Sequence, residues 1–107
     1  MIHLNIGSNL ESKFGNRFDN ISYAINLLIS LKLKIIKISN FYKTPSYPNK
    51  RNPYFLNVGV LAKYEFDAIT LINEISLIEK KIGRTKSKIN DPRVCDIDII
   101  DFNGLII

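Results

Sequence analysis

The sequence is poor in the residues that form disulfides and histidine-based catalytic sites. Its 107 residues include a single cysteine, Cys95, and a single histidine, His3. A lone cysteine excludes an internal disulfide and is typical of a reducing compartment, so we expect Cys95 to be a small apolar core residue and not a nucleophile. A lone histidine argues against a histidine-based dyad or a zinc site.

Long apolar runs are absent too. No stretch approaches the roughly 20 apolar residues of a membrane span, and the N-terminus lacks the basic and apolar regions of a signal peptide. We therefore expect a cytoplasmic protein without a membrane partner. The net charge of +5 suits an anionic partner, but charge alone does not distinguish polyphosphate, nucleic acid and an anionic membrane.

The apolar pattern predicts four strands and two helices in one domain, residues 1–107. Strands are expected over 2–6, 33–42, 55–64 and 94–102, with one helix over about 16–31 and another from the N-cap Asp67 to the C-cap Gly83. The predicted buried stripe of the second helix is Ala68, Leu71, Ile72, Ile75, Ile78 and Ile82. The order β-α-β-β-α-β predicts an α+β, ferredoxin-like fold, with both helices on one face of an antiparallel sheet.

Two aspartates on the last predicted strand are the best candidates for chemistry. Asp96 and Asp98 are one residue apart, so they lie on the same face of a strand with Cα atoms roughly 6.5 Å apart. Carboxylates that close can share a hard cation such as Mg²⁺. The preceding basic residues Arg84, Lys86 and Arg93 suit phosphate oxygens, although an ordinary solvated basic loop is the alternative.

Other candidates carry less specific signals. Glu79 lies in the last turns of the second helix, where the helix dipole disfavours an acid. Either a nearby cation or ligand compensates, or Glu79 is a plain surface residue. Phe55 and Asn57, near Thr44 and Pro45, could stack on and hydrogen-bond a flat heterocycle; otherwise Phe55 is a core residue and Asn57 a turn-facing polar group.

Together these segments resemble the 6-hydroxymethyl-7,8-dihydropterin pyrophosphokinases of folate biosynthesis. The resemblance rests on motifs in the family's order and close to its spacing, which cover the chain from end to end. They are Gly7-Ser8-Asn9-Leu10, Phe41-Tyr42-Lys43-Thr44-Pro45, Phe55-Leu56-Asn57, Ile78-Glu79, Gly83-Arg84, Pro92-Arg93 and Asp96-Ile97-Asp98-Ile99. Each motif is weak alone, but the set is highly specific.

The resemblance implies transfer of pyrophosphate from ATP to the pterin hydroxymethyl group, with release of AMP. It implies that Asp96 and Asp98 hold two Mg²⁺ ions, and that Arg84 and Arg93 are catalytic residues that bind the phosphates. It further implies a nucleotide site with Glu79 and Lys86, and a pterin pocket lined by Thr44, Pro45, Phe55 and Asn57. ATP and the hydroxymethyl dihydropterin would be the partners of a monomer that is fused to, or works beside, dihydropteroate synthase.

The chain also departs from the family. Residues 89–91 replace a tryptophan that many relatives carry, and the relatives continue for roughly another third of their length, as a fuller domain would. We therefore expect a domain without the family's C-terminal segment, either an N-terminal fragment or a shortened gene product. A catalytically impaired remnant and an RNA-binding ferredoxin-like module are the competing hypotheses; the second lacks the basic-Gly-aromatic run that stacks bases.

Overall fold

The computed structural model describes residues 1–45, 54–83 and 94–106. Its elements follow the predicted order, except that the second predicted strand is divided in two. They are β1 (Ile2–Ser8), α1 (Arg17–Ser30), β2 (Lys34–Ile38), β3 (Tyr42–Thr44), β4 (Phe55–Lys63), α2 (Ala68–Ile82) and β5 (Asp96–Phe102). Neither helix of this described part is long and apolar enough to cross a membrane.

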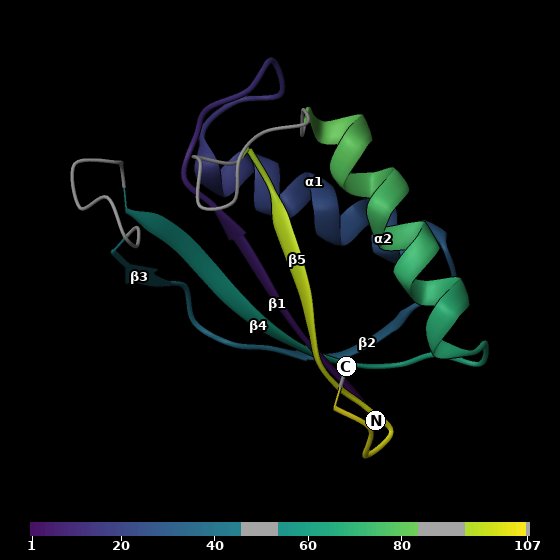
Figure 1. Cartoon of the computed structure of the whole chain (residues 1–107). Coiled ribbons are helices and arrows are strands. Elements are labelled where there is room, and N and C mark those ends of the chain that lie inside the picture. The colour runs from purple at the N-terminus through teal and green to yellow at the C-terminus, as the bar shows by residue number, and fades with distance from the viewer. Residues whose placement is uncertain (46–53, 84–93, 107) are drawn as a thin grey trace.

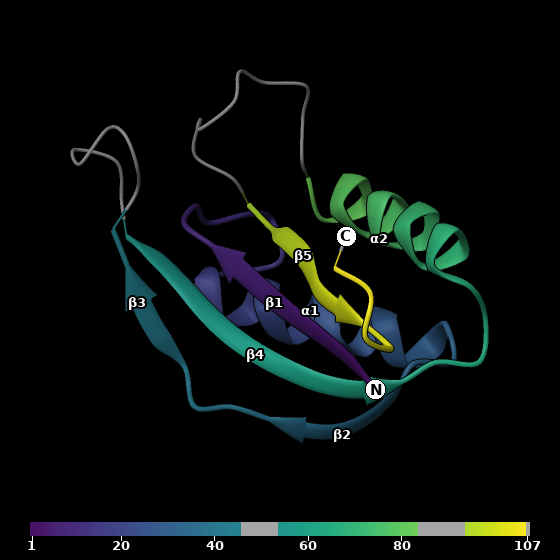
Figure 2. The same cartoon turned by 60° about the horizontal axis from the view of Figure 1, so that its bottom comes forward.

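The strands form one antiparallel sheet in the order β2-β4-β1-β5, and β3 pairs with the other end of β4. In Figure 1 and Figure 2 the long central strands β4 and β1 run side by side, with β5 next to β1. Strand β1 is central, because it pairs with β4 from Ile2 to Ser8 and with β5 from Ile2 to Gly7. This arrangement confirms the predicted ferredoxin-like fold class.

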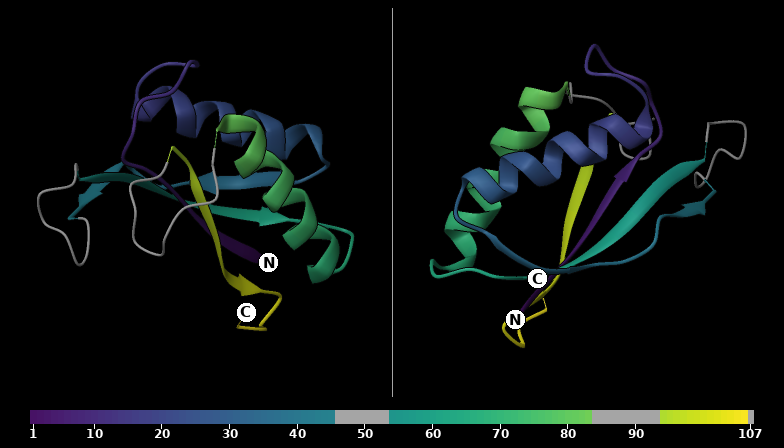
Figure 3. Two further views of the ribbon diagram at one scale, coloured as in Figure 1. Left: turned by 45° about the horizontal axis from the view of Figure 1, so that its top comes forward. Right: turned by 180° about the vertical axis from the view of Figure 1, so that it is seen from behind.

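Both helices lie on the same face of the sheet, as the views in Figure 3 show. The core fills the space between them and the sheet. Each partner contributes apolar residues at the spacing of its own element, every second residue in strands and every third or fourth in helices. The buried members include Ile2, Leu4 and Ile6 of β1, Val58, Val60 and Ala62 of β4, Ile21, Ala24 and Leu28 of α1, and Leu71, Ile75, Ile78 and Ile82 of α2. Cys95 is buried among them, as expected.

Both helices begin at side chains that satisfy free backbone N–H groups. At α1, Asn16 accepts from the N–H of Asp19 and the Asp19 carboxylate accepts from the N–H of Asn16, a capping box. At α2, Asp67 accepts from the N–H of Thr70, and Gly83, with φ of 128°, ends the helix. Both predicted caps of α2 are therefore confirmed.

The strand predicted over residues 33–42 is interrupted. Its register against β4 shifts between Ile35 and Lys37, and β2 ends at Ile38. The Ser39 hydroxyl oxygen then accepts from the backbone N–H of Gly59 at 2.8 Å, so a side chain takes the place of a strand carbonyl. A bulge adds a residue to one strand only, which a pattern of alternating apolar residues cannot reveal.

The prediction that Ile72 belongs to the buried stripe of α2 is wrong. Ile72 is 41% exposed, whereas Leu71 and Ile75 beside it are buried. Helical spacing correctly puts Ile72 on the side of α2 that faces β5, but a hollow separates the two elements there.

Candidate active site

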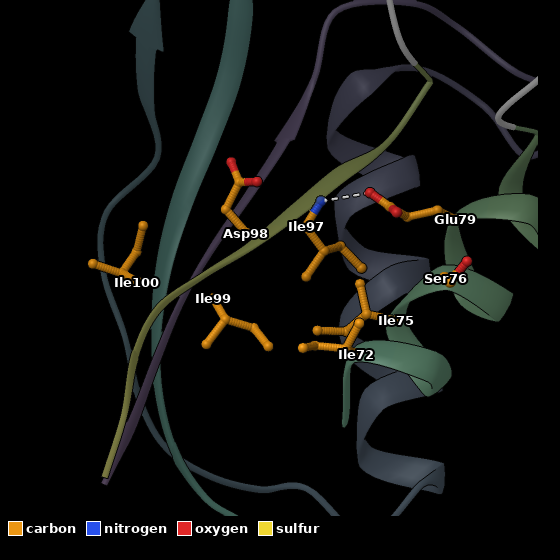
Figure 4. A pocket seen from close by; sticks show the side chains of 8 residues that line it. All are labelled: Ile72, Ile75, Ser76, Glu79, Ile97, Asp98, Ile99 and Ile100. Atoms are coloured by element: carbon orange, nitrogen blue, oxygen red, sulfur yellow. Dashed lines mark hydrogen bonds between the residues drawn. The ribbon is translucent and has the colours of Figure 1, made fainter. Parts of the chain in front are cut away.

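The face of the sheet opposite the helices carries the candidate residues, and we call it the helix-free face. Ile6 and Ile97 are paired across β1 and β5 and are buried toward the helices. Because side chains alternate along a strand, the neighbours Asp96 and Asp98 lie on the opposite face. Figure 4 shows the Asp98 carboxylate pointing away from α2. Asp98 is exposed and Asp96 is half-buried.

One row of residues crosses the helix-free face from β5 to β3, and we call it the central row. Asp96 pairs with Gly7, Gly7 pairs with Asn57, and Asn57 pairs with Tyr42. The carboxylate strand therefore lies two strand spacings from the strand of Asn57, roughly 9.6 Å. In the next row Asn5 pairs with Asp98. The sheet thus brings a pair of acids and a set of amide and aromatic side chains to one surface.

Asn57 is at the centre of the aromatic and amide cluster. Its Nδ2 donates to Thr44 Oγ1 at 2.8 Å and to the Phe55 carbonyl at 3.4 Å, while its Oδ1 accepts from Asn5 Nδ2 at 3.2 Å. Thr44 and Phe55 are themselves cross-strand partners. The structure therefore groups Thr44, Phe55 and Asn57, and exposed Pro45 follows Thr44 directly. Asn57 is buried and Phe55 is half-buried.

Gly7 makes room for this cluster. A Cβ at position 7 would lie 2.8 Å from Asn57 Oδ1 and 3.4 Å from Phe55 Cδ1. The first distance is shorter than real Cβ contacts, so only glycine allows the Asn57 amide to lie over β1. Buried Asn20 of α1 stabilises the turn that follows β1. Its Nδ2 donates to the Leu10 carbonyl at 2.9 Å and to Ser8 Oγ at 3.3 Å.

The aspartate pair suits a metal that is shared with a ligand. Among the residues that the structure describes, no group of three or more His, Cys, Asp or Glu side chains gathers to hold an ion. Mg²⁺ is commonly held by one or two carboxylates, with waters and substrate phosphates completing its shell. Asp96 and Asp98 supply two such carboxylates, and the remaining positions around the ion would be taken by waters and phosphate oxygens. Their oxygens therefore fit Mg²⁺ that arrives with a polyphosphate.

Glu79 lies on the other side of β5. It is buried, and its Oε2 accepts from the backbone N–H of Ile97 at 3.0 Å (Figure 4). The alternative of a plain surface glutamate is therefore wrong. The described contact is with a backbone amide, which is neither the cation nor the ligand that the sequence led us to expect. Glu79 and the Asp98 carboxylate are on opposite faces of β5.

A hollow of about 530 Å³ opens beside Glu79, between α2 and β5. Figure 4 shows Ile72 and Ile75 of α2 facing Ile97 and Ile99 of β5 across it. Its lining is largely isoleucine and is completed by Ser76, Glu79, Asp98 and Ile100. Its walls are therefore mainly apolar, and Ser76 and Glu79 add polar atoms.

Comparison with known proteins places the chain in a family. Residues 3–107 match the family described as 7,8-dihydro-6-hydroxymethylpterin-pyrophosphokinase. The chain belongs to this pyrophosphokinase family.

Individual members of the pyrophosphokinase family extend beyond the matched region. The chain is 31% identical to the 2-amino-4-hydroxy-6-hydroxymethyldihydropteridine pyrophosphokinase of Aquifex aeolicus, over 99% of the chain and 63% of that protein. It is 30% identical to the Bacillus subtilis enzyme of the same name, over 88% of the chain and 57% of that protein. It is 32% identical to the folic acid synthesis protein fol1 of Pneumocystis carinii, over 99% of the chain and 14% of that protein. The chain thus spans less than two thirds of the length of each of these relatives.

Three residues that the pyrophosphokinase resemblance assigns to phosphate binding lie outside the described residues. They are Arg84, Lys86 and Arg93. The described residues on either side of them are close to one another, because a Cβ on Gly83 would lie 3.8 Å from Val94 Cγ2. The end of α2 and the entry to β5 therefore meet next to Asp96.

Two polar residues of the candidate site, Asn5 and Tyr42, were not predicted as site residues from the sequence. Tyr42 donates its hydroxyl hydrogen to Asn5 Oδ1, and Asn5 in turn holds Asn57. The only signal was that Asn5 shares its strand face with Gly7 two residues later. The partners of Asn5 are Asn57 of β4 and Tyr42 of β3, and the local sequence pattern of β1 does not predict which strands lie beside it.

Proposed function

We propose that this domain transfers pyrophosphate from ATP to 6-hydroxymethyl-7,8-dihydropterin, giving AMP and the pterin diphosphate in folate biosynthesis. One observation carries the proposal. The central row pairs Gly7 with Asp96 on one side and with Asn57 on the other. A phosphate site with metal-binding carboxylates and a site for a flat heterocycle therefore share one surface, as a transfer between two bound substrates requires.

The heterocycle binds at the Asn57 side of the row. The Phe55 ring packs against the pterin face, and Asn57 and Thr44 hydrogen-bond its polar edge, with Pro45 beside them. Support comes from two hydrogen bonds, in which Thr44 Oγ1 and the Phe55 carbonyl accept from Asn57 Nδ2. Aromatic rings stack well on flat ring systems, and fixed amides discriminate their edges.

The nucleotide binds at the Asp96 side of the row. Asp96 and Asp98 hold two Mg²⁺ ions, which neutralise phosphate charge and orient the reacting oxygens when bound. The chain's own contribution is to position the two carboxylates on one strand face and to supply cations. Arg84 and Arg93 act as the catalytic cations and Lys86 assists them, an assignment that rests on the family resemblance. The adenine occupies the isoleucine-lined hollow beside Glu79.

The setting of this activity follows from the same resemblance. We place it in the cytoplasm, in a monomer that is fused to, or works beside, dihydropteroate synthase. A relative from Arabidopsis thaliana bears the name folate synthesis bifunctional protein and is 29% identical over 85% of the chain. An RNA-binding role is less well supported, because Asp96 in the central row would repel a phosphate backbone.

The test is AMP formation from ATP. We expect AMP only when Mg²⁺ and the hydroxymethyl dihydropterin are both present, and we expect Asp96→Asn to abolish it. AMP release that does not require the pterin would contradict the proposal. Asp101→Asn is the matched control, since Asp101 lies on the same strand and pairs with His3, away from the central row.

A second candidate is a domain that binds the substrates without turnover. It is favoured by the Asn57 cluster, in which hydrogen bonds join Asn5, Asn57 and Thr44 into a site that can bind a heterocycle without any reacting group. Calorimetry with the pterin and with Mg²⁺-ATP distinguishes the two. Binding of both ligands without AMP formation supports this second candidate, whereas binding of neither ligand contradicts both.

A further inference from the structure

We infer that Asn5 is a positioning residue that fixes which atoms of the pterin site accept hydrogen bonds and which donate them. The inference rests on the proposed function, because it concerns how the same site reads its heterocycle. It comes from a chain of side-chain hydrogen bonds that runs over the helix-free face and connects β3, β1 and β4.

The chain of hydrogen bonds has one direction. The Tyr42 hydroxyl donates to Asn5 Oδ1, Asn5 Nδ2 donates to Asn57 Oδ1 at 3.2 Å, and Asn57 Nδ2 donates to Thr44 Oγ1 at 2.8 Å. Hydroxyl groups can donate or accept, so the two ends alone would permit the reverse direction. The Phe55 carbonyl removes this freedom, since it can only accept and it lies 3.4 Å from Asn57 Nδ2.

Asn5 enforces the same direction from the other side. If the Asn57 carboxamide rotated by half a turn, its NH₂ group would face the NH₂ group of Asn5. Two donors would then meet, and both amides would lose a hydrogen bond. Asn5 could rotate to relieve this only if the Tyr42 hydroxyl accepted instead of donating. The whole chain of hydrogen bonds would then be reversed, and Asn57 Oδ1 would face the Phe55 carbonyl, which cannot donate.

The direction determines what the site offers a ligand. Asn57 Oδ1 lies over Gly7, on the side toward Asp96, because a Cβ on Gly7 would be only 2.8 Å from it. A carbonyl oxygen has two lone pairs, so this atom can accept from a ligand as well as from Asn5. Thr44 Oγ1 already accepts from Asn57, which leaves its hydrogen free to donate.

The site therefore fits a heterocycle edge on which an N–H donor adjoins a carbonyl acceptor, as in a lactam. An edge with the opposite order has an amino group beside an unprotonated ring nitrogen. Its amino donor would then face the Thr44 hydroxyl donor, and its ring nitrogen, an acceptor, would face the acceptor Asn57 Oδ1. A 4-oxo pterin has the first kind of edge and 2,4-diaminopteridine has the second. Asn5 would thus set the ratio between the two affinities, although it need not touch either ligand.

The experiment compares three variants of the 107-residue chain. Asn5→Leu keeps the approximate size and removes both hydrogen bonds, and Tyr42→Phe removes only the hydroxyl that holds Asn5. His3→Ala is the matched control, since His3 is exposed, lies on the same strand and face as Asn5, and has no part in the hydrogen-bond chain. Calorimetry with Mg²⁺ and α,β-methylene-ATP present gives the dissociation constants of 6-hydroxymethylpterin and of 2,4-diaminopteridine.

We expect Asn5→Leu to weaken pterin binding by about 3- to 10-fold, the range that one neutral hydrogen bond supports. The preference for the 4-oxo over the diamino heterocycle should fall by a similar factor. Tyr42→Phe should change both quantities in the same direction by less, and His3→Ala should change neither. Affinity for the ATP analogue should stay within about 2-fold in every variant, because variation of that size corresponds to less than one hydrogen bond.

The preference between the heterocycles separates positioning from plain packing. If Asn5 only supported the fold, both heterocycles would lose affinity equally and their ratio would not change; that result overturns the inference. A wild-type ratio in both Asn5→Leu and Tyr42→Phe overturns it as well, even if one variant is less stable. If the wild-type chain binds pterin while these variants match it, the proposed function stands and only the role of Asn5 falls. A wild-type chain that binds neither heterocycle rejects both.

Discussion

The helix-covered and helix-free faces are made by the same three strands, β1, β4 and β5, but have opposite compositions. Toward the helices, β1, β4 and β5 present Ile6, Val58 and Ile97, which are at most 6% exposed. Away from the helices, the adjacent positions present Gly7, Asn57 and Asp96. The first set drives folding by removing apolar surface from water, whereas the second contributes little apolar burial and places polar atoms for ligands.

The comparison shows why the register of β1 matters for both properties at once. A slip by one residue would move every side chain of β1 to the opposite face. Ile2, Leu4 and Ile6 would leave the core, and Asn5 would be buried against the helices. The core therefore sets the alignment that brings Gly7 between Asp96 and Asn57. Substitutions on one face should then affect either stability or binding, and seldom both.

The largest difference between the effect on binding and the effect on stability is expected at Asp96. Asp96→Asn should reduce the gain in ATP affinity that Mg²⁺ provides by at least about 100-fold, since even residues that only support a metal ligand contribute 10- to 100-fold. Its Tm should change little, because Asp96 lies outside the core. Calorimetry with ATP, with and without Mg²⁺, measures the first quantity. An unchanged Mg²⁺ effect would show that the carboxylate pair does not hold the metal.

The converse effect is expected at Leu4, on the other face of β1. Leu4→Ala should lower the free energy of unfolding by about 2–5 kcal/mol, because the side chain is fully buried and leaves a cavity. Urea denaturation measures the change. The ratio of pterin to nucleotide affinity in the folded protein should remain that of the wild type. A selective loss of pterin affinity would mean that the two faces are not independent.

Gly7 should be the exception, because a side chain there would be too close to the buried Asn57 amide. Gly7→Ala places a Cβ against Asn57 Oδ1, so the amide must move. We expect a loss of stability of about 1–3 kcal/mol, together with weaker pterin binding. The matched control is Gly59→Ala on β4, where the new Cβ would make an ordinary contact 3.4 Å from Ser39 Oγ. Equal effects at the two glycines would refute the special role of Gly7.

The smallest effect is expected at the start of α2, far from the helix-free face. Hydrogen bonds from the hydroxyl and the backbone N–H of Thr70 lower the pKa of Asp67 below its ordinary value of 3.8. A lowered pKa in the folded state stabilises the protein above the unfolded pKa, and this contribution is lost as the pH falls through the folded value.

Asp67→Ala should therefore reduce Tm by a few degrees at neutral pH, and the difference from wild type should shrink in acid. Thermal unfolding monitored at several pH values measures it. Asp67→Asn is the control, since asparagine also caps helices but does not titrate near this pH. A difference that grows in acid would contradict the cited cause. Pterin affinity should not change in either variant.

Most of the fold was readable from local patterns, because each element carries its own signal. Asp67 and Gly83 mark the ends of α2, and alternation marks β1 and β4. The break at Ser39 was not readable, since it depends on a hydrogen bond to Gly59 from a different strand. Ile72 was misplaced for a related reason: helical spacing gives the side of a helix but not the gap that faces it.

The candidate site was readable only in pieces. The spacing of Asp96 and Asp98 indicated one strand face, but the pterin assignment came from resemblance to a family. Asn5 was missed because its partners, Tyr42 and Asn57, lie on other strands. Glu79 was noticed as an acid at the wrong end of a helix, while its contact with Ile97 required the packing of α2 against β5.

That contact has a consequence for the solubility of the protein. Within the described sheet β5 is an outer strand, and the outward N–H groups of such a strand can recruit a strand from another molecule. Glu79 occupies the outward N–H of Ile97 and brings a carboxylate to the same margin. An approaching strand would have to displace that oxygen and break its hydrogen bond to Ile97. The glutamate thereby protects the margin of the sheet against aggregation.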